Sequence, residues 1–126
     1  IIHPEIKAWS GMLGTTFGGN YLAAIAGLAV LDVIEKENLI ENARLLGEYL
    51  IQSLKALPVI TDVRGRGLMV GFDLPESHKS VRSNLLHRHH IFTGEAKPNT
   101  IRLLPSLAVT RDEIDLFLNA LKEELQ

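Results

Sequence analysis

The chain has 126 residues, which is enough for one modest domain with a core of its own. Its hydrophobic fraction of 46% and charged fraction of 22% are typical of a globular protein and exclude an intrinsically disordered one. A formal net charge of -2 provides no basic surface for nucleic acid or an anionic membrane. Because the sequence has no cysteine, a disulfide scaffold, a zinc ribbon and a thiol nucleophile are all excluded.

The first residues do not look like a translation start. Position 1 is an isoleucine, and neither an initiator methionine nor a signal-peptide pattern is visible, so we expect a piece of a longer protein. Residues 1–12, which include His3-Pro4, predict an irregular lead-in. The longest apolar run, over residues 21–34, is interrupted by Asp32 and is too short to cross a bilayer. It predicts a helix that protein encloses on most sides.

The junction at residues 14–20 is the first candidate site. Two hydroxyls, those of Thr15 and Thr16, lie beside a pair of glycines where the loop becomes a helix. The first N–H groups of a helix lack intrahelical partners and lie at the positive end of its dipole, so they suit a phosphate or a carboxylate. The alternative is an ordinary N-cap, in which Asn20 or Thr16 accepts a hydrogen bond from the helix start.

A second helix and a hairpin follow. From Glu35 to Pro58 the apolar residues recur at helical spacing, and the proline ends the helix. Two β-rich runs, at 59–63 and 68–74, flank Arg64-Gly65-Arg66-Gly67 and predict an antiparallel hairpin. The apolar stripe of the second helix consists of Leu39, Ala43, Leu46, Leu50 and Leu54.

A polar helix is predicted over 77–89, with Ser77 as its cap and three histidines at its end. A His-rich tract can bind metal, but no carboxylate or fourth ligand accompanies this one at a recognisable spacing. We therefore expect surface histidines and no native metal site. The expected inward residues are Val81, Leu85 and Leu86, and the histidines are His87, His89 and His90.

The last third of the chain predicts two short strands and a helix. The strands, at 91–93 and 101–104, flank a turn at 95–99. Thr110 begins the helix, and Glu113 three residues later completes a capping box. The buried stripe of this helix is expected to be Ile114, Phe117, Leu118, Leu121 and Leu125.

Arg102 is the second candidate site, because an arginine in the middle of an apolar strand is unusual unless its guanidinium meets an anion. The planar guanidinium can bind a carboxylate through two parallel hydrogen bonds, which lysine cannot imitate. The alternative is that Arg102 points outward from a half-exposed strand and pairs with a glutamate.

Three segments in this order resemble the class III, ornithine-type aminotransferases, which depend on pyridoxal phosphate. The first is Gly14-Thr15-Thr16-Phe17-Gly18-Gly19-Asn20 with the small-residue helix over 22–34. The second is Val63-Arg64-Gly65-Arg66-Gly67-Leu68-Met69-Val70-Gly71. The third is Ile101-Arg102-Leu103-Leu104-Pro105-Ser106-Leu107, followed by Thr110-x-x-Glu113-Ile114-Asp115.

The resemblance implies an α+β fold, the small C-terminal domain of a fold type I transferase. It has a short, mainly antiparallel sheet packed against helices and is preceded by a long interdomain helix. By this resemblance, residues 1–20 are a remnant of the junction with the large cofactor domain and contain a phosphate-contacting loop. Residues 21–126 form the small domain. We expect the first helix to lie against the large domain, and the isolated chain to self-associate through it.

The resemblance also implies roles for three residues. Thr16 contacts the cofactor phosphate, across a dimer interface and in the neighbour's site. Thr15 lies where the family contacts substrate, and Arg102 binds the α-carboxylate of the amino or oxo acid. The lysine that the family attaches to its cofactor precedes the threonines, and Lys7 lacks that lysine's glycine-rich surroundings, so no catalytic residue is assigned.

The implied function is that of the acetylornithine-type members: transfer of an amino group from N-acetylornithine to 2-oxoglutarate in arginine biosynthesis, by a cytoplasmic homodimer. This chain by itself is expected to be inactive. Succinylornithine, ornithine or 4-aminobutyrate aminotransferases remain alternatives, because the acyl pocket is built largely from residues absent here. A non-catalytic α+β dimerisation module is the other alternative, and the coding sequence upstream of Ile1 distinguishes it.

Overall fold

The computed structural model describes residues 5–7, 9–12, 14–96 and 99–126. The predicted lead-in at His3-Pro4 and the centre of the predicted turn at 97–98 lie outside these residues. In chain order the elements are α1 (Tyr21–Lys36), α2 (Leu39–Lys55), β1 (Thr61–Arg66), β2 (Met69–Asp73), the 3₁₀ turn η1 (Glu76–His78), α3 (Val81–His89), β3 (Gly94–Ala96), β4 (Thr100–Leu103) and α4 (Arg111–Glu124).

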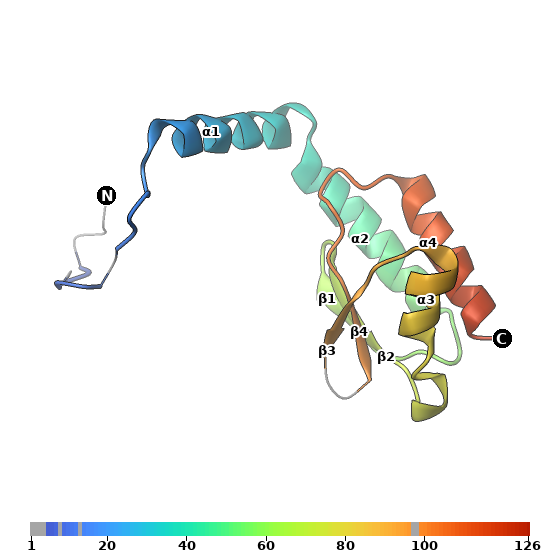
Figure 1. The fold of residues 1–126 in the computed structure, drawn as a ribbon. Helices are drawn as coiled ribbons and strands as arrows, with labels where there is room; N and C mark the ends of the chain where they lie inside the picture. The colour runs from blue at the N-terminus through green and yellow to red at the C-terminus, as the bar shows by residue number, and fades with distance from the viewer. Residues whose placement is uncertain (1–4, 8, 13, 97–98) are drawn as a thin grey trace.

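The strands form one antiparallel sheet in the order β1-β2-β4-β3, with α2, α3 and α4 gathered on one side of it (Figure 1). Alternation along the central strands places Val70 and Phe72 of β2, and Ile101 and Leu103 of β4, against the helices. The predicted α+β class is therefore confirmed. The core is completed mainly by Leu50, Leu54, Val81, Leu85, Ile114, Phe117, Leu118 and Leu121.

The last helix forms as its sequence predicts. The Thr110 hydroxyl accepts a hydrogen bond from the backbone N–H of Glu113, and the Glu113 carboxylate accepts one from the backbone N–H of Thr110 at 2.7 Å. A second carboxylate ties this helix to α3. The Glu124 side chain is only 3% exposed and contacts Asn84, Arg88 and His89 at 2.6, 2.8 and 2.9 Å. The predicted inward stripe is buried except for Leu125, which is half-buried.

The hairpin is shifted from its predicted position. The chain leaves α2 through a turn in which the Ile60 N–H bonds the Leu57 carbonyl, so β1 starts two residues later than expected. It then continues through the glycine-rich segment as far as Arg66, which pairs with Met69. The turn itself is formed by Gly67, with φ of +54°, and Leu68.

Close approach of the hairpin turn to α2 requires a glycine in the helix. A Cβ placed on Gly47 would lie 2.2 Å from the carbonyl oxygen of Gly67, well inside any tolerable contact. The absence of a side chain at position 47 therefore lets the turn rest on the backbone of α2. This contact fixes the position of the β1–β2 hairpin relative to the helix.

Three local predictions are wrong around α3. Its first residue is Val81 and not Ser77, because the Ser77 hydroxyl bonds Nδ1 of His78 instead of a backbone N–H. Leu86 is 39% exposed and not inward. Residues 91–93 are not a strand, since the Ile91 N–H bonds the Leu85 carbonyl at the end of α3, and pairing with β4 begins at Gly94.

The first helix is exposed in this chain, as expected where the large domain is not present to cover it. No residue of α1 is buried. The helix projects away from the sheet and from the other helices, and the N-terminal segment lies beyond its far end (Figure 1). Its exposed apolar side chains are Tyr21, Leu22, Ile25, Leu28, Val30, Leu31 and Val33. Within this chain, nothing in the described residues covers that surface.

We predict opposite effects for two helical Gly→Ala substitutions. Gly47→Ala should lower the free energy of unfolding by about 1–3 kcal/mol, because the new methyl group overlaps the turn at Gly67. Gly27→Ala meets nothing within 4 Å and should increase helix stability by about 0.5–1 kcal/mol. Urea denaturation monitored by circular dichroism measures both effects. Equal unfolding midpoints for Gly47→Ala and the wild type would contradict the close approach.

We predict that the isolated chain self-associates through α1, because an exposed apolar surface of this extent favours association. The double substitution Ile25→Glu and Leu28→Glu should return it to a monomer, since these side chains are 65% and 67% exposed. Leu116→Glu is the control, because Leu116 is a similarly exposed leucine on α4. Sedimentation equilibrium measures the mass. A monomeric wild type at high concentration would disprove the prediction.

Candidate functional site

The face of the sheet opposite the helices carries a row of cross-strand neighbours that contains both arginines of interest. Arg64 of β1 pairs with Gly71 of β2, Gly71 pairs with Arg102 of β4, and Arg102 pairs with Gly94 of β3. Residues paired in this way point to the same face of a sheet. The two arginines therefore share one face, and Gly71 between them has no side chain to separate them.

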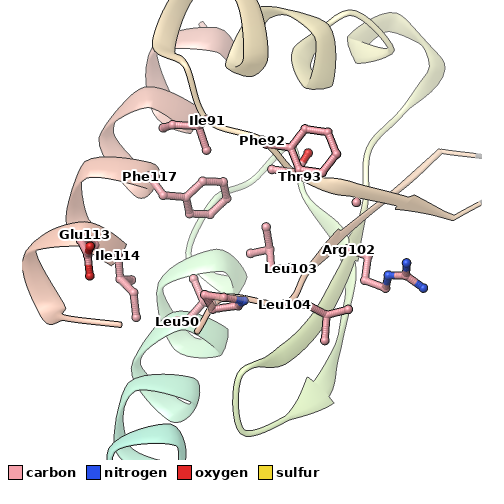
Figure 2. A pocket seen from close by; sticks show the side chains of 12 residues that line it. Leu50, Ile91, Phe92, Thr93, Arg102, Leu103, Leu104, Glu113, Ile114 and Phe117 are labelled. Carbon is pink, nitrogen blue, oxygen red and sulfur yellow. The ribbon is translucent and has the colours of Figure 1, made fainter. Parts of the chain in front are cut away.

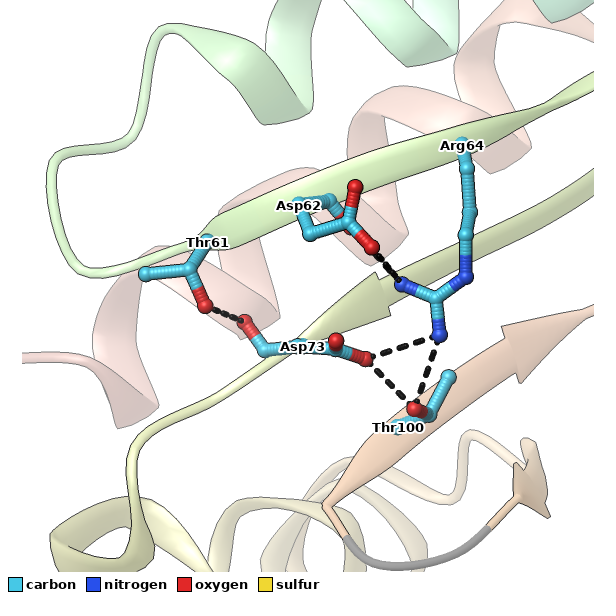
Figure 3. Close-up of polar contacts among 5 residues, drawn as sticks. All are labelled: Thr61, Asp62, Arg64, Asp73 and Thr100. Carbon is cyan, nitrogen blue, oxygen red and sulfur yellow. Dashed lines mark hydrogen bonds and ion pairs between the residues drawn. The ribbon is translucent and has the colours of Figure 1, made fainter.

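The Arg64 guanidinium is held by partners within the chain (Figure 3). Nη1 donates to the Asp62 carboxylate at 2.5 Å, and Nη2 donates to Asp73 and to the hydroxyl of Thr100, both at 3.0 Å. The Thr100 hydroxyl also donates to Asp73. The hydrogen bond from Arg64, and to a smaller extent the one from Thr100, holds the pKa of the Asp73 carboxyl below its ordinary value of 3.8. The cluster links β1, β2 and β4, so Arg64 has a structural role.

Arg102, in contrast, has no partner among the described residues. It is the exposed residue in a strand whose other three residues are buried. Five of the seven arginines form ion pairs, and Arg66 and Arg102 form neither an ion pair nor a hydrogen bond within the described part of the chain. Arg102 thus points outward, as the alternative interpretation expected, but without the glutamate partner which that interpretation required.

The Arg102 side chain lies over Gly94. A Cβ placed on Gly94 would be 3.3 Å from Nε of Arg102, so the missing side chain leaves room for the guanidinium to lie across β3. Figure 2 shows the guanidinium pointing away from the apolar side chains around it. An unpaired guanidinium with its donors free is suited to a carboxylate or a phosphate.

A cavity of about 380 Å³ opens beside Arg102 (Figure 2). It reaches from the exposed side chains of Phe92 and Leu104 to the core residues Leu50 and Phe117. Thr93 also lines it, and its hydroxyl is buried without a hydrogen-bond partner among the described residues. The cavity was not expected from the sequence. Its buried polar residue, Thr93, lies within residues 91–93, which the sequence predicted to be an ordinary strand.

The threonine loop lies apart from this cavity. Asn20 forms the N-cap of α1, since its side-chain oxygen accepts from the backbone N–H of Ala23 at 2.9 Å. Of the two N-cap candidates, Asn20 therefore has that role and Thr16 does not. The hydroxyl of Thr16 is exposed and has no partner among the described residues, so it is available to a ligand. The Thr15 side chain packs over Gly18, where a Cβ would lie 1.9 Å from its methyl carbon.

A single chain does not bring the predicted site residues together. Thr15 and Thr16 precede α1, and the segment that contains them lies beyond the end of α1 farthest from the sheet (Figure 1). Arg102 lies on the sheet at the other end of the molecule. Lys7 is exposed. Any site that uses both the threonines and the arginine must therefore combine more than the described residues of one chain.

Neither a metal site nor a membrane-spanning helix is found among the described residues. Among the described residues, no group of three or more His, Asp or Glu side chains is arranged to hold a metal ion. His89 contacts Glu124, whereas His87 and His90 are exposed at the end of α3. In the same part of the chain, no helix combines the length and apolarity that crossing a bilayer requires.

Comparison with known proteins identifies the class. A family model described as aminotransferase class-III matches residues 4–125. An ornithine aminotransferase from Staphylococcus carnosus is 43% identical over 115 residues, which are 90% of this chain and 29% of that protein. An acetylornithine aminotransferase from Bifidobacterium longum is 41% identical over 115 residues, 90% of this chain and 27% of that protein.

Comparison with solved structures indicates the same class of protein. A lysine aminotransferase from M. tuberculosis matches with a TM-score of 0.80 and 34% identity, covering 92% of this chain and 28% of that one. An amine transaminase from an uncultivated Pseudomonas species, in its PLP-bound form, matches with a TM-score of 0.76 and 32% identity. The match covers 91% of this chain and 29% of that one. The chain belongs to the class III aminotransferases. It spans less than a third of the length of these relatives.

Class III aminotransferases depend on pyridoxal phosphate. The described residues fit one part of the site of such a cofactor. The free hydroxyl of Thr16, in a glycine-rich loop at the start of a helix, is a suitable donor to a phosphate oxygen. The described residues do not show a complete phosphate cradle.

We predict that Asp73→Asn makes the free energy of unfolding fall less steeply as the pH is lowered toward 3. Because the pKa of Asp73 is lower in the folded chain than in the unfolded one, its contribution is fully present above the ordinary value of 3.8. That contribution is lost as the pH falls through the lower, folded value. Urea midpoints measured between pH 6 and 3 test this. Asp32→Asn on α1, which lies outside the sheet, is the control, and an unchanged acid slope in Asp73→Asn would contradict the role of the cluster.

Proposed function

We propose that this chain is the C-terminal domain of a pyridoxal-phosphate aminotransferase that moves an amino group from N-acetylornithine to 2-oxoglutarate. The observation that carries the proposal is Arg102, whose guanidinium lies on the exposed face of the sheet and has no partner among the described residues. Both substrates bear a carboxylate, which an arginine binds through two parallel charge-assisted hydrogen bonds. Residues 1–20 are then the junction with the cofactor domain, and 21–126 are the small domain.

The free hydroxyls before α1 supply the other half of the proposal. Thr16 donates a hydrogen bond to the cofactor phosphate, and Thr15 contacts the substrate beside it. Because the threonines and Arg102 lie at opposite ends of the molecule, we infer that Thr16 serves the site of a second subunit in a homodimer. The apolar surface of α1 supports this arrangement, since it requires a partner to cover it.

The chemistry is divided between the cofactor and the protein. When bound, pyridoxal phosphate supplies the electron-withdrawing ring that allows the amino group to be exchanged. This chain holds the substrate carboxylate with Arg102 and the phosphate with Thr16. No described residue is positioned as a catalytic base: Lys7 is exposed and remote from Arg102. We therefore expect the chain to be inactive without the large domain, and we place the complete enzyme in the cytoplasm and in arginine biosynthesis.

Ornithine is the second candidate amino donor. The S. carnosus ornithine aminotransferase and the B. longum acetylornithine aminotransferase are 43% and 41% identical to this chain, a difference too small to decide. Arg102 would bind the carboxylate of either donor. The choice therefore depends on what lies beside the carboxylate.

We predict that Arg102→Lys weakens the binding of 2-oxoglutarate to the chain about 10- to 100-fold, because lysine cannot form the two parallel hydrogen bonds. Backbone amide resonances of β3 and β4, followed by NMR during a titration, measure binding in the wild type and in each variant. Arg66→Lys is the control, since Arg66 lies on the same sheet face and also has no partner in the part of the chain that the structure describes. Equal loss in both variants would indicate nonspecific attraction and refute the assignment of Arg102.

We predict that the chain alone does not bind pyridoxal phosphate covalently. Borohydride treatment of a mixture of the two should leave the mass of the chain unchanged. Lys7→Arg serves as the comparison, because it keeps the charge and removes the reactive amine. A stoichiometric mass increase in the wild type that Lys7→Arg abolishes would show that the chain carries its own reactive lysine.

A further inference from the structure

The cavity of about 380 Å³ lies between two segments, and the first of them is held in place by α3. The Ile91 N–H donates to the Leu85 carbonyl at 2.8 Å, and Nε of Arg82 donates to the Thr93 carbonyl at 3.4 Å. Both ends of the segment 91–93 are therefore bonded to α3. It cannot move toward β4 without breaking these hydrogen bonds.

The second segment, residues 103–105, is held from the other side. Pairing between β3 and β4 ends at Gly94 and Arg102, so the two segments share no strand pairing beyond that point. The loop that follows is bonded to α2, because the Asn42 side-chain amide donates to the carbonyls of Leu107 and Val109 at 2.8 and 3.0 Å. Protein interiors are normally close-packed, and here hydrogen bonds on both sides keep a cavity open.

The inner wall of this cavity is apolar except for one hydroxyl. Leu50, Leu103 and Phe117 of the core form part of the wall. Thr93 also lines it and is only 5% exposed, and its hydroxyl has no hydrogen-bond partner among the described residues. A buried hydroxyl left unpaired is costly, and its hydrogen requires an acceptor. An occupant that supplies one acceptor would remove this cost.

The charged residues of the lining do not serve the interior. The Arg102 guanidinium points away from the apolar side chains, and Glu113 lies at the other end of the cavity (Figure 2). The Glu113 carboxylate accepts hydrogen bonds from the backbone and the hydroxyl of Thr110 in the cap of α4. A charged occupant would lose its hydration without gaining an ion pair, so the interior suits an uncharged molecule.

We propose that this cavity is a binding site for a small uncharged carbonyl compound with an apolar body, whose oxygen accepts a hydrogen bond from the Thr93 hydroxyl. Apolar cavities of this kind bind small apolar molecules more readily than they fill with water. The site does not use Arg102 and does not depend on the proposed function. Its occupant enters between Phe92 and Leu104, which are 77% and 60% exposed.

The test is an NMR titration of the chain, with labelled isoleucine and leucine methyl groups, using cyclohexanone and methylenecyclohexane as probes. The two molecules have nearly the same shape, and only the ketone carries an oxygen acceptor. Cyclohexanone should shift the methyl resonances of Leu103 and Ile114, which line the cavity, and leave Ile60 elsewhere in the core unchanged. Equal shifts at all three residues would indicate nonspecific partitioning into the core and refute the site.

Thr93→Val tests the hydroxyl, which makes no hydrogen bond within the described chain and can be removed without breaking one. This variant should weaken the binding of cyclohexanone, relative to methylenecyclohexane, about 3- to 10-fold, as expected for one neutral hydrogen bond. Thr93→Ser keeps the hydroxyl and should retain the preference for the ketone. An equal effect of Thr93→Val on both probes would refute the assigned hydrogen bond.

Two further outcomes would overturn the proposal. If cyclohexanone shifts neither Leu103 nor Ile114, the cavity holds water only. If Arg102→Lys weakens the binding of cyclohexanone as much as Thr93→Val does, the cavity is not independent of the guanidinium. Neither result bears on the binding of 2-oxoglutarate by Arg102, so this proposal and the proposed function fail separately.

Discussion

The structure depends on the antiparallel pairing of β2 with β4, the two central strands of the sheet. Because side chains alternate along both strands, this pairing places Val70, Phe72, Ile101 and Leu103 against the helices. The same alternation places Arg102 on the opposite face. The interaction that builds the core thus also exposes the guanidinium, and a shift of one residue in the pairing would exchange the two faces.

The other elements are arranged around this pair by a few specific contacts. The β1–β2 hairpin rests on α2 where Gly47 leaves room for the turn, and the Arg64 cluster links three strands on the outer face. The helix α3 is tied to α4 through Glu124. These contacts hold polar and backbone groups within the chain. Arg102 and Thr16 have no such partners among the residues that the structure describes, which distinguishes them from residues with a structural role.

The molecule carries the two parts of the proposed site and an exposed apolar helix. The threonine loop and Arg102 lie at opposite ends of the chain, with the apolar helix α1 between the loop and the sheet. Such an arrangement is understandable in a class III aminotransferase, since the relatives compared above are about three times as long as this chain.

The sequence by itself determined the features that depend on neighbours along the chain. Helical periodicity predicted α2 and α4, Thr110 and Glu113 predicted a capping box, and the motifs identified the family. Only the tertiary structure decided the remainder. Ser77 is not a cap, because its hydroxyl bonds His78, and residues 91–93 leave the sheet because the end of α3 holds them. The lack of a partner for Arg102 among the described residues likewise depends on what other segments cover. These features arise from contacts between residues distant in sequence, which periodicity and propensity do not contain.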